Sequence, residues 1–204
     1  MRYVQFGLLC EGSTDWAVLP ALLEKAIQAL LAEDEVHDHF EWQIAPAGLP
    51  SDDQIAKTVS TATYDVVLVH RDGASRAEAV RTRIHEHGAV PVVPVREMEA
   101  WLIVEPEAFA RAANVSADRL SAKLPRGAAV EEISDPKAVM QEILESCFRR
   151  PPRGARSDDL EWYLEIVAAQ VNLEALRQLD AFRRTLVDLR KALAAMGWPF
   201  RQSG

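Results

Sequence analysis

Carboxylate side chains follow three segments of the sequence that have the pattern of β-strands. Glu11 comes after the first segment, Asp72 after another, and Glu97 and Glu99 after a third. If these strands run parallel in one sheet, their carboxyl ends lie along one edge, where the connecting loops form a crevice. Such an edge would suit a hard divalent cation such as Mg²⁺, which binds carboxylate and phosphate oxygens.

Each of these acidic residues also has an ordinary structural interpretation. Glu11 would stabilise the N-terminus of the following helix, and Asp72 would form a turn. Glu97 and Glu99 would be solvated residues of a first helical turn. The occurrence of acids at three strand ends favours the metal site over these separate roles.

A cluster of arginines in the C-terminal half is a second group that could contact phosphate. Arg149, Arg150, Arg153 and Arg156 lie within eight residues, and guanidinium groups match phosphate oxygens in geometry and charge. Lys137, near the start of a predicted helix, is a further phosphate-binding candidate. The alternative is a solvated linker whose arginines pair with neighbouring acids.

The elements that would position these residues alternate over the first hundred positions, as in a parallel sheet with right-handed helical crossovers. Apolar, β-branched runs predict four strands, and amphipathic spacing predicts helices between them. Pro91 and Pro94 each remove a backbone donor from the fourth strand, which favours an edge position or a bulge. The predicted strands span residues 3–10, 40–45, 65–70 and 89–95, and the predicted helices span 13–31, 51–62 and 75–87.

After residue 96 the pattern predicts helices alone, over residues 97–104, 106–113, 116–123, 136–148, 159–170 and 180–196, with polar joints at 126–134 and 149–157. We therefore expect an α/β domain over residues 1–105. An all-helical extension over residues 106–204 would pack on it as one structural unit. Trp101, Trp162 and Tyr163 fall at helical positions beside leucines, where core packing is the ordinary role.

The composition is that of an ordinary globular protein. The chain has 204 residues, 49% of them apolar, and two cysteines, which favours a reducing, cytoplasmic setting. Its apolar runs are far shorter than the roughly 18 residues that cross a bilayer, so we expect no membrane segment.

The net charge of −8 is divided unevenly along the chain. Residues 1–105 contain 8 basic and 17 acidic residues, whereas residues 106–204 contain 15 basic and 14 acidic residues. The acidic half cannot bind a phosphate backbone without cations or help from the other half.

Several motifs, in their order and spacing, resemble the TOPRIM (topoisomerase–primase) group. More closely, the chain resembles small TOPRIM-like prokaryotic proteins associated with phage defence and mobile elements. The likeness spans most of the chain and rests on residues 10–15 (CEGSTD), 69–73 (VHRDG), 95–102 (VREMEAWL), 134–137 (SDPK) and 181–183 (AFR).

This resemblance implies a TOPRIM-like fold with a catalytic cluster that binds Mg²⁺. The family's first-strand glutamate, a general acid/base, falls on Glu11, and its Asp-x-Asp metal pair begins at Asp72. The glutamate before Ala-Trp-Leu falls on Glu99. The sequence departs from the pattern at Ala74, where a second carboxylate is expected.

The missing carboxylate weakens a hard-ion site, because two-metal cleavage needs enough anionic ligands to hold two cations about 3.5–4 Å apart. Ser75 or Glu97 would be substitutes. His70 could contribute a nitrogen, which suits Mn²⁺ better than Mg²⁺. We expect one metal ion rather than two, with Glu11, Asp72, Glu97 and Glu99 as the candidate ligands.

These features lead to an expected function and an alternative. The first is a Mg²⁺-dependent nuclease, or a degenerate one, in a defence or toxin-like system, with nucleic acid held through the metal and the arginine segment. The alternative is a non-catalytic regulatory subunit that binds a nucleotide or a partner, such as an ATPase or a second copy of the chain. A small-molecule phosphotransfer or hydrolytic enzyme would use the same crevice and the same kind of metal site.

Overall fold

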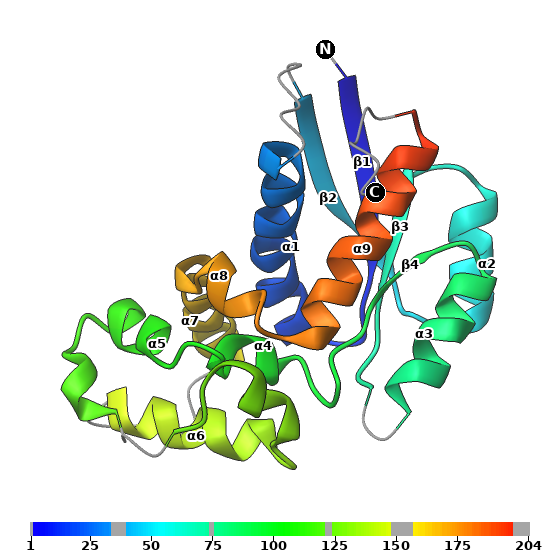
Figure 1. The fold of residues 1–204 in the computed structure, drawn as a ribbon. Coiled ribbons are helices and arrows are strands. Elements are labelled where there is room, and N and C mark those ends of the chain that lie inside the picture. The colour runs from blue at the N-terminus through cyan, green and yellow to red at the C-terminus, as the bar shows by residue number, and fades with distance from the viewer. Residues whose placement is uncertain (1, 34–39, 74–75, 121–123, 148–156, 198–204) are drawn as a thin grey trace.

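Four parallel strands form one sheet in the order β2-β1-β3-β4 (Figure 1). The computed structural model describes residues 2–33, 40–73, 76–120, 124–147 and 157–197. The strands are β1 (Arg2–Leu9), β2 (Phe40–Gly48), β3 (Val66–His70) and β4 (Val90–Val92). The predicted α/β class, with a four-stranded parallel sheet flanked by helices, is confirmed.

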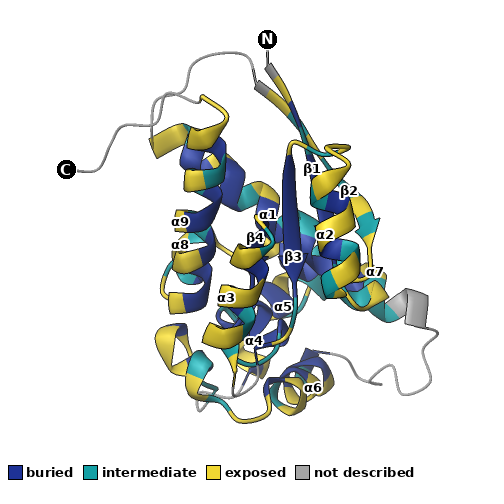
Figure 2. Cartoon of the chain, turned by 90° about the vertical axis from the view of Figure 1, so that its right-hand side faces the viewer, coloured by how far each residue is buried: buried dark blue, intermediate teal, exposed yellow. Residues whose placement is uncertain are grey.

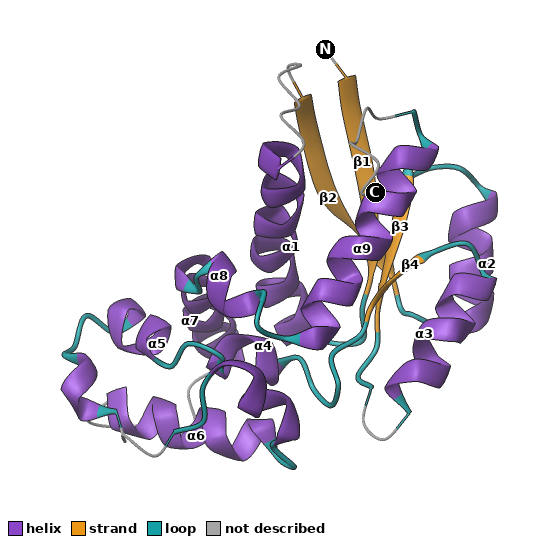
Figure 3. Ribbon diagram, viewed as in Figure 1, coloured by secondary structure: helices purple, strands orange, loops and turns teal. Residues whose placement is uncertain are grey.

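Apolar side chains of the strands point alternately to the two faces of the sheet, and each face packs against a hydrophobic core. Phe6 and Leu8 of β1 face the larger core, which includes α1 (Ser13–Glu33). Leu9 and Val67 face the opposite side, where α2 (Asp52–Ser60) and α3 (Ala77–Glu86) pack. The first helix therefore covers one face and the next two cover the other (Figures 1 and 3).

The fourth strand lies at the edge of the sheet, as its prolines predict. It is shorter than predicted, because β4 spans only Val90–Val92 whereas the apolar run extends over residues 89–95. The edge is covered by α9 (Asp180–Ala195), whose Thr185 hydroxyl donates a hydrogen bond to the Pro91 carbonyl at 3.3 Å. Proline is tolerated here because an edge strand needs donors on one side only.

The chain after residue 96 is helical, as predicted, but three of its segments differ from the prediction. One is the short helix α8 (Leu173–Leu176), which was not predicted. Of the predicted helix at 116–123, the described part forms only a 3₁₀ turn, Ala117–Arg119, and the predicted joint at 126–134 contains a 3₁₀ helix, Gly127–Glu132. The α-helices of this part are α4 (Glu99–Ile103), α5 (Glu107–Ala112), α6 (Pro136–Cys147), α7 (Ser157–Gln170), α8 (Leu173–Leu176) and α9.

These helices share one continuous core with α1 and the sheet (Figure 2). Trp101 is buried and meets the Phe182 ring of α9 edge-on at 5.3 Å, and the buried Tyr163 hydroxyl donates to the Phe109 carbonyl. The core role predicted for Trp162 is wrong, because 65% of this residue is exposed. No helix in the described ranges is long and apolar enough to cross a membrane.

Candidate active site at the carboxyl edge of the sheet

The strand order places the carboxyl ends of β1, β3 and β4 side by side. The loop after β1 leads to α1 on one face, and the loop after the neighbouring β3 leads to α3 on the other face. Loops that diverge in this way leave a crevice, which is where open α/β sheets bind ligands. The residues predicted at three separate strand ends therefore border one region.

The start of α1 orients the first acidic side chain. The Gly12 carbonyl accepts the first helical hydrogen bond, from Trp16, so Gly12 is the N-cap residue. The Asp15 carboxylate accepts the Gly12 N–H at 3.0 Å, which is one half of a capping box. Its other oxygen, Oδ1, lies 3.7 Å from Nε2 of His70.

His70, the last residue of β3, is the buried centre of this region. Its Nδ1 lies 2.9 Å from the Val92 carbonyl oxygen, which can only accept, so Nδ1 carries a hydrogen. Nε2 consequently faces the carboxylates of Asp15 and Asp72, at 3.7 and 3.6 Å. A backbone carbonyl that fixes one ring nitrogen and leaves the other for a charged partner is typical of ligand-binding histidines.

Asp72 lies between this histidine and the segment that follows β4. Its Oδ1 accepts the Met98 backbone N–H at 3.2 Å, which joins the ends of β3 and β4. Loss of hydration is the largest effect and raises the pKa of Asp72. His70 lowers this pKa, the nearby Asp15 carboxylate raises it, and Lys137 and the Met98 N–H lower it, and the net change is upward. The Asp72 carboxyl is thus held in a crowded, partly dehydrated anionic environment.

Lys137 brings a cation to the acids that follow β4. It lies in the first turn of α6, where the Asp135 carboxylate caps the helix by accepting the Ala138 N–H. Its Nζ lies 3.4 Å from Glu97 and 3.9 Å from Glu99. Desolvation acts to lower the pKa of Lys137, but Glu99, Glu97 and Asp72 together raise it.

Glu99 is the most buried carboxylate of this cluster, with 8% of its side chain exposed. Burial raises the pKa of Glu99, and Asp72 and Glu97 also act in that direction, whereas Lys137 lowers it. We refer to Asp15, His70, Asp72, Glu97, Glu99 and Lys137 as the carboxyl-edge cluster.

The structure places the sequence-predicted residues unequally. Asp72, Glu97, Glu99 and Lys137 interact with one another, whereas Glu11 is exposed in the β1–α1 turn and makes no hydrogen bond or ion pair with the described residues. The predicted arginine contacts Arg149, Arg150, Arg153 and Arg156, together with Ala74 and Ser75, lie outside the described residues.

Asp15 is the functional candidate that the strand-end pattern does not single out. An acid in the first turn of a helix is usually a capping residue, and Asp15 does cap Gly12. Its second role depends on the position of α1 beside β3, which brings it to His70 although the two are far apart in the sequence.

The donor set of the cluster fits a hard cation bound together with substrate. Among the described residues, no three His, Cys, Asp or Glu side chains are placed to hold an ion by themselves. Mg²⁺ does not need such a cage, because one or two carboxylates plus substrate phosphates and waters complete its coordination. Asp72 and Glu99 would provide those carboxylates, and His70 would add a nitrogen for Mn²⁺.

Gly73 keeps the Asp72 loop against the end of β4. A Cβ atom at this position would lie 2.2 Å from the Pro94 carbonyl oxygen and 2.9 Å from that of Val95, so the backbone would have to move. We expect Gly73→Ala to lower the free energy of unfolding by about 1–3 kcal/mol, the range for overpacking. Urea denaturation of Gly73→Ala and of the original protein would measure it. Equal stability of the two proteins would contradict this packing.

The raised pKa of Glu99 predicts a pH-dependent stability. The pKa of Glu99 is higher in the folded protein than its ordinary value of 4.5. The ionised carboxylate therefore lowers the free energy of unfolding as the pH rises from 4.5 through the folded pKa. Glu99→Gln should therefore increase Tm at pH 7 and should match the original protein below pH 4.5. Thermal scans across this pH range test it, with exposed Glu142→Gln as the control; a lower Tm at pH 7 for Glu99→Gln would contradict the sign.

Comparisons with known proteins identify a family over most of the chain. A family model described as "Domain of unknown function (DUF4276)" matches residues 10–189, a range that includes every member of the carboxyl-edge cluster. No curated protein matches the chain. No solved structure matches it either.

Proposed function

The chain belongs to the DUF4276 family, and we propose from its carboxyl-edge cluster that it is a TOPRIM-like, metal-dependent nuclease. The observation that carries this proposal is the gathering of Glu97 and Glu99 around the Lys137 ammonium group, at 3.4 and 3.9 Å, with Asp72 near enough to raise the pKa of Glu99. The excess of carboxylates over cations there favours a divalent ion.

In this proposal each residue has a distinct role. Asp72 and Glu99 would hold Mg²⁺ or Mn²⁺, which would supply Lewis-acid polarisation of the phosphate and stabilisation of the leaving oxygen. The Met98 N–H and His70 orient Asp72, since both contact its Oδ1. Lys137, more than half of whose side chain is exposed, contacts a phosphate oxygen. Glu11, exposed at the rim, accepts a proton from the attacking water.

One observation favours a second candidate, a regulatory subunit that binds a nucleotide or a partner without cleaving it. The Lys137 ammonium group already compensates part of the negative charge of Glu97 and Glu99, and the described side chains contain no complete three-ligand metal group. In this case the crevice would bind phosphate through Lys137 and would not need a metal ion.

Cleavage assays separate these two candidates. End-labelled single-stranded and duplex DNA and RNA are incubated with the protein in Mg²⁺, in Mn²⁺ and in EDTA. The nuclease proposal expects cleavage that requires a divalent ion and is reduced by Glu11→Gln. Absence of cleavage with every substrate and metal would overturn it in favour of the binding subunit.

A further inference from the structure

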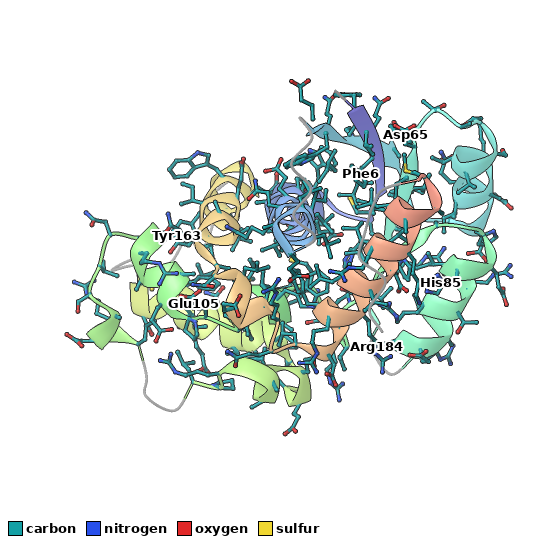
Figure 4. The ribbon with its side chains drawn as sticks, turned by 45° about the horizontal axis from the view of Figure 1, so that its top comes forward. Phe6, Asp65, His85, Glu105, Tyr163 and Arg184 are labelled. Atoms are coloured by element: carbon teal, nitrogen blue, oxygen red, sulfur yellow. The ribbon has the colours of Figure 1, made fainter. Side chains whose placement is uncertain are left out.

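A groove of about 610 Å³ lies between α3 and α9. Figure 4 shows His85 on α3 and Arg184 on α9, at the two sides of this groove. Its lining has four cationic and three anionic side chains besides His85, and we call it the α3–α9 groove. Its basic residues are Arg81, His85, Arg183, Arg184 and Lys191, and its acidic residues are Glu78, Asp180 and Asp188.

The floor of the groove is a buried ion pair with an unused donor. Arg81 and Asp188 are paired, and only 7% and 8% of their side chains are exposed. The same Asp188 oxygen also lies 3.3 Å from Nε2 of His85. Nη1 of Arg81 is buried and has no hydrogen-bond partner among the described residues. A buried guanidinium normally uses its donors, so this N–H indicates a place for an additional acceptor.

The rim of the groove carries exposed arginines whose present partners are easily replaced. Arg184 pairs with Glu78 at 2.5 Å, and Arg183 pairs with Asp180 within the same turn of α9. More than half of each arginine side chain is exposed. Exposed ion pairs contribute at most about 1 kcal/mol, so a phosphate oxygen could replace these carboxylates at little cost.

The two helices that line the groove begin at the same end of the sheet as the carboxyl-edge cluster. Helix α3 follows Gly73 and the end of β3. The first turn of α9 is anchored by Glu131, whose carboxylate accepts the N–H groups of Asp180 and Ala181. In Figure 1 the N-terminal ends of α3 and α9 both lie at the end of the sheet where the strands finish.

We propose that the α3–α9 groove binds the phosphate backbone of a nucleic-acid strand and leads this strand to the carboxyl-edge cluster. The inference rests on the proposed nuclease function, because it names the route by which the substrate reaches that site. The groove itself needs no metal ion, since arginine side chains supply the charge. It also gives the acidic first half of the chain a basic surface, built partly from the second half.

Fluorescence anisotropy in EDTA tests this surface separately from catalysis. The probe is a labelled single-stranded oligonucleotide of about 20 nucleotides, titrated between about 50 and 200 mM salt. The double variant Arg183→Gln/Arg184→Gln should raise Kd at least tenfold. The slope of log K against log salt should fall in magnitude by roughly 1.4, the value for two lost contacts with a single strand. Arg81 is left intact, because its removal would leave Asp188 buried without its partner.

A charge-matched control and a competitor complete the experiment. The variant Lys57→Gln/Arg119→Gln removes two exposed cations elsewhere and should keep the original Kd. Equal Kd values for the groove variant and the original protein would overturn the proposal, as would binding of ATP in place of the oligonucleotide. Loss of binding in the groove variant supports it even if no metal yields cleavage. Cleavage with unchanged binding of the groove variant sustains the nuclease function and rejects the groove.

Discussion

Replacement of Asp72 by Asn should reduce metal-dependent phosphodiester cleavage by about 10³-fold without loss of stability. The amide keeps an oxygen that can accept the Met98 N–H, so the link between the ends of β3 and β4 persists. The substitution removes the charge that would hold the cation, and transition-state charge in a dehydrated site depends strongly on such groups. It also removes the repulsion from Asp15 that raises the pKa of Asp72.

Three measurements test this role: the cleavage rate, the Mn²⁺ affinity from calorimetric titration, and Tm. For Asp72→Asn we expect lost activity, weaker Mn²⁺ binding and a Tm equal to or above the original. Exposed Glu142→Gln on α6 serves as the control, because it removes an acid outside the cluster. An Asp72→Asn protein that cleaves at the original rate would exclude the assigned role, and one with a much lower Tm would show a mainly structural residue.

Replacement of Trp101 by Ala should lower the free energy of unfolding by about 3–5 kcal/mol, the range for removal of a buried large aromatic side chain. Trp101 is 1% exposed on α4 and contacts the Phe182 ring of α9 edge-on. Because Glu99 lies two residues earlier in the same helix, the cavity would also loosen the helix that positions this carboxylate. Urea unfolding curves provide the measurement.

Two comparisons make this prediction specific. Trp101→Phe should cost less than half as much as Trp101→Ala, because it retains an aromatic ring and the indole N–H has no hydrogen-bond partner among the described residues to lose. Trp162→Ala should stay within about 0.5 kcal/mol of the original protein, since this side chain is exposed. Similar costs for the two Trp→Ala variants would contradict the observed burial.

The helices and strands of the first half follow from local sequence pattern. Strand β3 and helix α2 lie within two residues of their predicted limits, because a buried strand is continuously apolar and Ser51 caps the helix by accepting the Gln54 N–H. The phase of a helix is harder to predict. Trp162 and Tyr163 are adjacent in α7, and only their packing partners decide that Tyr163 is buried and Trp162 is exposed.

The carboxyl-edge cluster was partly predictable for a related reason. Parallel strands place their carboxyl ends at one edge, so the sequence is sufficient to predict that Asp72, Glu97 and Glu99 approach one another. It does not predict that Asp15 rather than Glu11 faces His70, because this depends on which strand lies beside β1 and on the cap that orients Asp15.

The amino-acid sequence by itself determined the α/β class, the order of the elements and the edge that carries the acids, because the period of apolar residues and the geometry of caps and prolines are local properties. The tertiary structure alone decided the strand order, the His70 contacts and the α3–α9 groove. Glu78 and Arg184 are 106 residues apart in the chain, and their ion pair exists because α9 packs over the edge strand β4. Such contacts depend on the packing of distant apolar surfaces, which leaves no local signal in the residues that it brings together.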